Sequence, residues 1–395
     1  MTHSSYRNLW ILSAAQLFAV SGSLIFFTFG GIIGADLAPR AELSTVPLAL
    51  AVIGTALTSL PAALIMQRIG RRRAFMISAL LASLAALFCS YSIAQHHFAG
   101  FCIAALLFGF NMAFVQQYRF AAIEFVSPTH TTRAVTSIMI ATLVAVIVWP
   151  ELGGRVRFAG KLPEFSATFV LVAILCWIAI AILSALPAMT IIKHERTQTS
   201  HSVWQAINNP NIKVAILAGI ASFAVMSFIM VATPISMHKL DAMSVEQTKQ
   251  VISLHLIGMY LPSLFSGWLI RTLGHLWLML LGVICMAACV IMSVMMGHHF
   301  MHYLGGLALL GIGWNFLFVS GTTLLATSYS NEDRFKVQGF NDLAVFGTQA
   351  LVSMASGPVV LLLGWEKLNL LTIPVLVMML IGISSLWWQR RAIRT

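Results

Sequence analysis

The chain repeats itself once, at a fixed offset, inside a nearly unbroken series of membrane-length apolar segments. Gly70 lies in an arginine-rich loop after the second segment, and Gly274 lies in the matching loop after the eighth, 204 residues later. The same offset relates Gly109–Asn111 to Gly313–Asn315. Self-similarity at one long offset indicates two halves of related structure, each with matching helices and loops.

The composition explains why such a chain needs lipid as its solvent. Of its 395 residues, 59% are apolar and 9% are charged, whereas soluble domains carry roughly 25% charged residues. A helix crosses the hydrocarbon layer with about 20 apolar residues, and backbone in lipid must be hydrogen-bonded internally. The sequence predicts an all-α integral membrane fold of 12 transmembrane helices in two pseudo-symmetric six-helix bundles. The predicted spans cover residues 9–35, 44–66, 74–94, 99–126, 134–154, 166–191, 214–237, 247–270, 276–296, 303–328, 337–362 and 367–388.

Three parts are expected along the chain. An N-terminal bundle is predicted over residues 1–191, a cytoplasmic linker over 192–212, and a C-terminal bundle over 213–395. The linker lies in the longest polar stretch of the chain. Within it, the segment 203–208 is predicted as a short interfacial helix with its tryptophan at headgroup depth, and a proline at position 210 stops that helix.

The net charge of +11 is distributed as expected for a membrane protein and not for a nucleic-acid surface. With the N-terminus inside, fifteen Lys and Arg residues lie on the inner side, seven on the outer side, and Arg119 lies within a span. The positive-inside rule then predicts a multi-pass membrane protein with both termini cytoplasmic. The seven outer residues are Arg40, Arg155, Arg157, Lys161, Lys239, Lys249 and Lys367.

The loop after the second span carries most of a known signature, Gly-x-x-x-Asp-Arg-x-Gly-Arg-Arg. In the segment Ala63–Arg72 the initial glycine is replaced by Ala63 and the acid by Gln67, and the remaining positions match. The repeat keeps the first glycine as Gly267 but has Arg271 at the acid position. With these loops, twelve spans and two halves, the chain resembles the major facilitator superfamily over essentially its full length.

The resemblance implies a secondary active transporter that moves a small organic solute by alternating access around a central site. It also implies a monomer without a cofactor, and a cytoplasmic latch that holds the second helix against the eleventh. Because Gln67 replaces the usual acid, we expect Asp342 and Glu124 to supply negative charge to Arg68 and Arg71. The alternative is that the arginines only set topology. The predicted cytoplasmic gate comprises Gln67, Arg68, Arg71, Arg133, Arg271 and Asp342.

Polar residues within the spans are the candidates for the substrate site, since ionisable groups in lipid are costly. Arg119 has no ionised residue four positions away, so its counter-ion comes either from another helix or from an anionic substrate. Asn111 and Asn315 occupy equivalent mid-helix positions; we favour cavity lining over hydrogen bonding between helices. The predicted substrate-binding residues are Gln16, Asn111, Gln117, Arg119, Met226, Trp314, Asn315 and Gln349.

A proton gradient is the expected energy source, because the sequence has no Gly-x-x-x-x-Gly-Lys-Ser/Thr loop for ATP. The coupling candidates are Glu124, Glu151, His255 and Asp342. A structural hydrogen bond is the alternative role for His255, and placement at the membrane interface is the alternative for Glu151. Uptake of a vitamin or siderophore and efflux of drug-like molecules both fit. A lining rich in aromatic and Met residues suits a planar cargo.

Two other classes of function are weighed against transport. A membrane-embedded enzyme would need paired carboxylates, a metal cluster or a nucleophile with its base, and the sequence has no such motif, so we expect no catalysis. A transporter-like sensor that binds without moving cargo is the second alternative. The histidine-rich outer loops, His96–His97 and His298–His302, are either polar turns or metal ligands, and we expect no metal because no carboxylate or cysteine in the sequence converges on them.

Overall fold

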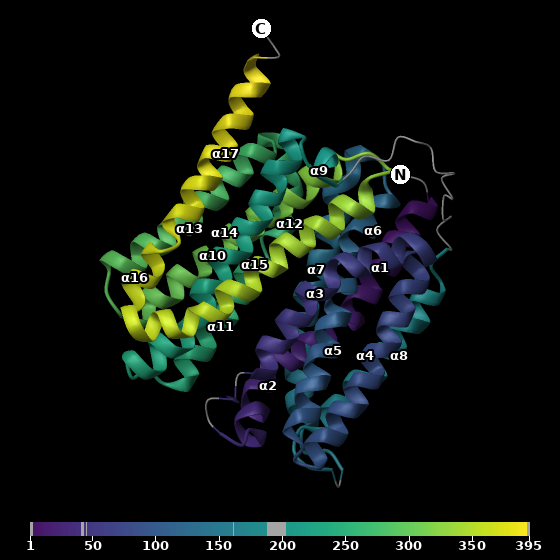
Figure 1. The fold of residues 1–395 in the computed structure, drawn as a ribbon, viewed down its shortest axis with the longest axis vertical. Helices are drawn as coiled ribbons and strands as arrows, with labels where there is room; N and C mark the ends of the chain where they lie inside the picture. The colour runs from purple at the N-terminus through teal and green to yellow at the C-terminus, as the bar shows by residue number, and fades with distance from the viewer. Residues whose placement is uncertain (1–2, 41–42, 45, 161, 188–202, 393–395) are drawn as a thin grey trace. The chain divides into compact units, whose positions relative to one another are not determined.

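The structure is a computed structural model that describes residues 3–40, 43–44, 46–160, 162–187 and 203–392. Contacts divide the described residues into two compact units (Figure 1). Unit 1 draws on the segments 1–130, 137–200 and 332–347, and unit 2 draws on 131–136, 201–331 and 348–395.

Unit 1 consists of long helices joined by short loops, coloured purple to blue in Figure 1, together with a later segment of the chain. Two of its spans are made of consecutive helices: α1 and α2 form one, and α5 and α6 form another. The helices are α1 (His3–Ala19), α2 (Ser21–Leu37), α3 (Val46–Ile69), α4 (Arg71–Ala94), α5 (Phe98–Gln116), α6 (Tyr118–Glu124), the 3₁₀ turn η2 (Pro128–His130), most of α7 (Thr131–Val156), α8 (Ser166–Ser184) and the first part of α15 (Arg334–Leu363).

Unit 2 has the same kind of architecture, coloured teal to yellow in Figure 1. One of its spans is broken: α11 and α12 meet at an angle of 41°. The elements are α9 (Val203–Ala206), α10 (Pro210–Ile235), the π-helix η3 (Ser236–Leu240), α11 (Val245–Tyr260), α12 (Ser263–Leu273), α13 (His275–Met295), α14 (Phe300–Ala326), the rest of α15, α16 (Trp365–Leu370) and α17 (Ile373–Ala392), with the start of α7.

The predicted fold class is confirmed. By length and hydropathy, eleven helical segments among the described residues can cross a membrane, and the bent pair α11–α12 brings the number to twelve. Helix α8 ends at Ser184, before the predicted end of its span. Much of the predicted linker lies outside the described residues, and within it α9 carries an exposed Trp204. The predicted boundaries of the bundles and linker stay a prediction.

The repeated glycines have a conformational reason. Gly70 precedes α4 with φ 83° and ψ 151°, and Gly274 precedes α13 with φ 88° and ψ 165°. This region of backbone space is essentially open to glycine alone. Each glycine therefore allows the chain to reverse between two antiparallel spans in the space of one residue.

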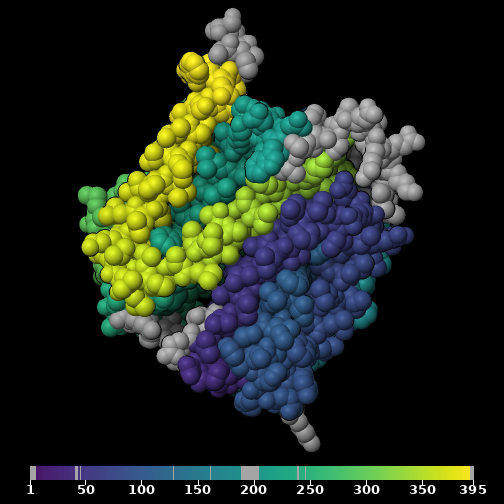
Figure 2. Space-filling view, viewed as in Figure 1, coloured from purple at the N-terminus to yellow at the C-terminus, as the bar shows by residue number. Residues whose placement is uncertain are grey.

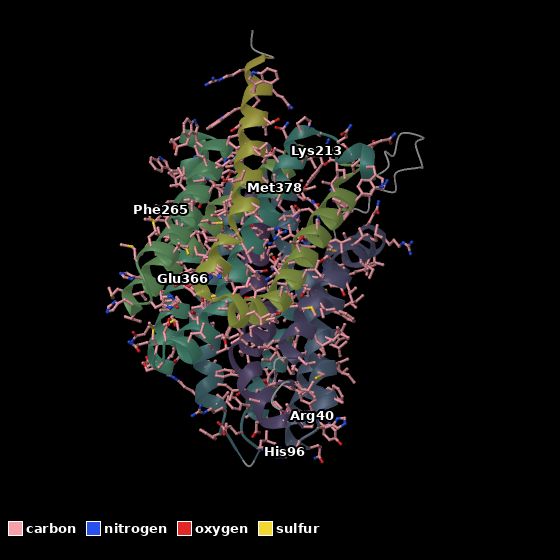
Figure 3. All side chains as sticks on the ribbon, turned by 60° about the vertical axis from the view of Figure 1, so that its left-hand side comes forward. Arg40, His96, Lys213, Phe265, Glu366 and Met378 are labelled. Carbon is pink, nitrogen blue, oxygen red and sulfur yellow. The ribbon has the colours of Figure 1, made fainter. Side chains whose placement is uncertain are left out.

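The outward faces of both units are apolar, as lipid contact requires. On unit 2, the later part of α15 and the pair α16–α17 lie along the face seen in Figure 2. Leu351, Leu362 and Ile381 of these helices are exposed. Figure 3 shows Phe265 on the outside of the same unit. On unit 1, Ile77 and Leu84 of α4 are exposed in the same way.

The short loops alternate between the two ends of each unit. Figure 3 shows Arg40 and His96, from two loops of unit 1 that were both expected on the outer side, at the same end of that unit. In unit 2, Lys213 lies at the start of α10, and Glu366 lies near the opposite end of the unit (Figure 3). This alternation fits antiparallel neighbours joined by short connections.

Candidate functional site

A buried cluster of charged and amide side chains occupies one end of unit 1. We call Arg71, Gln117, Arg119, Glu124, Gln338 and Asp342 the polar cluster. They come from the start of α4, the junction of α5 and α6, and the first turns of α15. Asp342 lies about 12 Å along α15 from its first residue, so the cluster reaches from the helix ends into the span.

Arg71 ties three of these elements together. Its Nε and Nη2 donate to Glu124 Oε1 at 3.0 and 2.6 Å, and Nη2 also donates to Gln338 Oε1 at 2.7 Å. Its Nη1 donates to Gln117 Oε1 at 3.3 Å. The guanidinium is 1% exposed and stacks over the ring of Phe335 at 4.9 Å. Charge-assisted bonds of this kind are the strong ones in proteins, so the start of α4 is fixed to α6 and α15.

The second ion pair of the cluster lies deeper. Arg119 Nη2 donates to Asp342 Oδ1 at 2.5 Å, and the two side chains are 2% and 1% exposed. Gln117 Nε2 donates to Asp342 Oδ2 at 2.7 Å, while its Oε1 accepts from Arg71. Asn341 adds a third donor to the carboxylate. One amide side chain therefore connects the two ion pairs into a continuous network.

This geometry answers a question that the sequence left open. The counter-ion of Arg119 is Asp342, a residue 223 positions away, and Glu124 pairs with Arg71. A buried ion pair is held against its desolvation cost only where geometry and further hydrogen bonds are good. Here both carboxylates have several donors, and Arg334 adds a further cation 3.6 Å from Glu124. The two ion pairs of the cluster are therefore supported by further donors from neighbouring helices.

The other predicted gate residues lie outside the polar cluster. Gln67 and Arg68 are exposed at the end of α3, and Arg133 and Arg271 are exposed in unit 2. Sequence reasoning missed Gln338, although it lies one helical turn before Asp342, and that spacing could have identified it. The side-chain oxygen of Gln338 accepts a hydrogen bond from Arg71, so Gln338 belongs to the network.

Close packing of α15 against α3 helps to position the first turns of α15, which carry part of the polar cluster. A Cβ atom placed on Gly339 of α15 would lie 2.9 Å from Ala63 Cβ of α3. In unit 2, a Cβ atom on Gly267 of α12 would lie 3.5 Å from Thr132 Cγ2 of α7. Ala63 and Gly267 differ by 204 positions, which is the offset of the repeat. The two units thus use corresponding residues for corresponding contacts.

The side chains of both asparagines in the repeated motif are hydrogen-bonded to neighbouring helices. Asn111 accepts from Ser78 at 2.7 Å and donates to the Ala19 carbonyl at 3.4 Å. Asn315 accepts from Ser266 at 2.8 Å and donates to the Met259 carbonyl and to Ser263. The structure therefore favours the packing alternative for these amides over the cavity lining that the sequence analysis preferred.

An aromatic cluster surrounds Trp314 in unit 2. The indole stacks on Phe318 at 4.8 Å with an interplanar angle of 15°, and it meets Phe223 and Tyr260 edge to face at 5.3 and 5.7 Å. Trp314 is 2% exposed, and among the described residues no acceptor lies within hydrogen-bond reach of its Nε1–H. A buried donor without an acceptor is rare and marks a position where a ligand oxygen would be stabilised. Met226 is buried in the same unit.

The remaining candidates are spread over both units. Gln16 donates to Thr142 Oγ1 at 3.0 Å, while its buried Oε1 has no donor among the described residues. Gln349 is half-buried on α15. His255 is fully buried, with Nδ1 2.8 Å from the Leu307 carbonyl. Glu151 pairs with Arg155 on an exposed helix surface, which agrees with placement at the membrane interface.

Comparison with known proteins agrees with the observed fold. The sequence profile of the Major Facilitator Superfamily matches residues 11–235 and 214–394. The riboflavin transporter RfnT of Brucella anthropi is 34% identical over 377 residues, which are 95% of this chain and 94% of that protein. The crystal structure of the human organic anion transporter MFSD10 superposes with a TM-score of 0.78 at 12% identity, covering 97% of this chain and 100% of that one. The proton:xylose symporter XylE superposes with a TM-score of 0.74 at 12% identity, covering 97% and 99% of the two chains.

Proposed function

Because this chain belongs to the Major Facilitator Superfamily, we propose that it is a secondary active transporter of riboflavin or of a closely similar planar solute. The observation that carries the proposal is the 34% identity to a riboflavin transporter over 95% of the chain. Similarity of that extent runs through nearly the whole chain and is not confined to one segment.

The aromatic cluster of unit 2 supports a planar cargo. Riboflavin has a flat three-ring system with two carbonyl oxygens on one terminal ring and a polyhydroxylated chain on the central ring. Aromatic side chains gain from offset or edge-to-face contact with such rings. The Nε1–H of Trp314 supplies a donor for a ring carbonyl, since this N–H has no acceptor among the described residues.

The transport cycle that we propose is alternating access in the inner membrane with both termini cytoplasmic. A cargo changes the balance between two open states only by the difference in its affinity for them. Coupling to protons requires a group whose protonation changes that difference.

Asp342 is the carboxylate that we propose for this coupling. It lies inside a span and accepts from Arg119, Gln117 and Asn341. Protonation would remove its charge, weaken the bond to Arg119 and loosen the link that Gln117 makes to Arg71. Of the other candidates, Glu151 is exposed and paired on its own helix. Because Asp342 is also one of the predicted gate residues, the coupling site would be part of the cytoplasmic gate.

The polar cluster is the gate in this proposal. Arg71 holds the beginning of α4 to α6 and α15, and Gly339 holds α15 against α3. Loss of one carboxylate would release α15 at this end. In place of the signature's usual acid, the chain would use Glu124 and Asp342.

Riboflavin flux in proteoliposomes tests the proposal. Purified protein is reconstituted, and labelled riboflavin is followed in both directions with and without an imposed proton gradient. We expect accumulation that depends on the gradient and is lost in the Asp342→Asn variant. Absence of flux in both directions, in a preparation that binds no riboflavin, would overturn the proposal.

Binding is measured separately through quenching of flavin fluorescence by stacked aromatic rings. Trp314→Phe keeps a ring but removes the N–H, whereas Trp314→Leu removes the ring as well. We expect weaker binding in the first and a further loss in the second. Binding with no flux in the wild-type protein would instead support the sensor alternative.

A further inference from the structure

His298 of unit 2 lies between two carboxylates that are far from it in sequence, so the expectation that no carboxylate converges on the outer-loop histidines was wrong. It belongs to the loop that joins α13 to α14, between two membrane-spanning helices. Its Nδ1 lies 2.7 and 2.9 Å from the two oxygens of Asp241, and its Nε2 lies 2.6 Å from Glu366 Oε1. Asp241 follows the π-helix η3, and Glu366, labelled in Figure 3, is the second residue of α16.

This arrangement specifies a protonated ring. A neutral imidazole has one N–H donor and one lone pair, and a lone pair facing a carboxylate oxygen at 2.6 Å would be repulsive. With both nitrogens protonated, each donates to one carboxylate. The side chains of His298 and Asp241 are 29% and 13% exposed, so the pair is only partly screened by water.

The groups around the ring complete its electrostatic environment. Tyr303 of α14 donates to Asp241 Oδ2 at 2.7 Å and lies 2.7 Å from Ser236 Oγ. Lys367 is exposed next to Glu366. The ring of His299, on the loop, lies 5.7 Å from the ring of His302, in the first turn of α14, and His302 is hydrogen-bonded to the Gly297 carbonyl. The two carboxylates are the groups bonded to the imidazole.

The segment that Asp241 links to the His298 ring is the C-terminal end of α10, which has an unusual backbone geometry. Helix α10 contains Pro234 and passes into a π-helix, Ser236–Leu240. π-helical turns are rare and frequent at functional sites. Two residues later Ala242 has φ 51°, which is uncommon for a residue with a side chain. Such a turn persists because surrounding contacts fix it, and Asp241 supplies two of them.

We propose that Asp241, His298 and Glu366 form a second protonation site of this transporter, whose titrating ring, that of His298, lies outside the membrane-spanning segments and which fixes the end of α10 while His298 carries a proton. We call these residues the His298 clasp. When the proton leaves, one of the two carboxylates loses its donor and the link from η3 to α16 opens. Although partial burial opposes the charge, hydrogen bonds to Glu366 and Asp241 outweigh it and raise the pKa of His298 above 6.5.

The sign of the pH dependence follows from that direction. A group whose pKa is raised on folding stabilises the folded arrangement below its ordinary pKa, and the contribution is lost as the pH rises through the folded-state pKa. The clasp is therefore closed at acidic pH and opens as the pH increases. A transporter exposed to protons at this end would sense them before the cargo enters.

Histidine NMR titration of the full chain in lipid nanodiscs tests the clasp. His298→Gln assigns its ring signal, and His302, in the first turn of α14 and hydrogen-bonded to the Gly297 backbone carbonyl, provides the matched control. We expect His298 to titrate at higher pH than His302. We expect Glu366→Gln to lower the midpoint of His298 by about one pH unit, a tenfold loss of proton affinity. A midpoint no higher than that of His302, or one unmoved by Glu366→Gln, would overturn the proposal.

Hydrogen exchange reports the structural consequence. The amides of Asp241 and Met243 donate to Ser236 and Met237 carbonyls at 3.0 and 2.8 Å. After correction for the intrinsic rate, we expect their protection to fall as the pH passes the midpoint of His298, and to be low at all pH values in His298→Gln. Protection that follows neither change contradicts the clasp. The inference rests on the proposed function only for its role in transport: absent riboflavin flux with intact titration would refute the cargo and leave the clasp standing.

Discussion

Replacing Gly339 by Ala tests whether close approach of α15 to α3 is required in unit 1. The new Cβ would lie 2.9 Å from Ala63 Cβ and 2.9 Å from Leu60 Cδ1, whereas carbon atoms pack best at about 3.5–4.0 Å. The helices must therefore separate by roughly 0.6–1 Å. Overpacking of this kind costs about 1–3 kcal/mol, while alanine gains up to about 1 kcal/mol over glycine as a helix former.

Gly347, on the same helix, provides a control that separates the cost of overpacking from the gain in helix propensity. A Cβ on Gly347 would meet nothing within 4 Å, so Gly347→Ala carries only the helix-propensity gain. We expect the two variants to differ in free energy of unfolding by about 1–3 kcal/mol, measured by denaturant titration in detergent micelles. The double variant Ala63→Gly/Gly339→Ala should recover most of the loss. Equal stabilities for Gly339→Ala and Gly347→Ala would refute the packing argument.

Three further outcomes are expected. Arg119→Ala leaves Asp342 buried without its cation and should lower the free energy of unfolding by about 3–5 kcal/mol; a thermal unfolding midpoint equal to that of the wild type would contradict the ion pair as a buried, stabilising contact. Gly274→Ala, at φ 88°, should cost about 1–3 kcal/mol in the same assay, and a neutral result would mean that the turn relaxes easily. Glu151→Gln removes an exposed pair and should change stability by less than about 0.5 kcal/mol and leave the pH profile of flux unmoved; a shifted profile would make Glu151 a coupling residue.

Much of the fold follows from the sequence because hydropathy acts locally and adds along the chain. A run of twenty apolar residues has few alternatives to a spanning helix, since lipid offers its backbone no hydrogen bonds. The offset of 204 residues similarly predicted corresponding turns, and Gly70 and Gly274 share one backbone conformation because only glycine adopts it easily.

The candidate site was predictable only in part. Polar residues within the spans, such as Arg119 and Asp342, stand out because each is costly in lipid. What periodicity does not encode is the partner of each. Asn111 and Asn315 looked equally suited to a cavity, and their bonds to neighbouring helices became visible only when those helices were in place.

The sequence by itself determined the solvent of this protein and its helices, because these depend on residues close together along the chain, and its internal repeat, because that is a property of residue order alone. The sequence offered Glu124 as a partner for Arg71, but tertiary structure decided that pair, and it alone decided that Arg119 pairs with Asp342 and that His298 joins Asp241 to Glu366. Those pairings join residues 53 to 223 positions apart. Charges attract over distances in space, and only the packed helices determine which of them are neighbours.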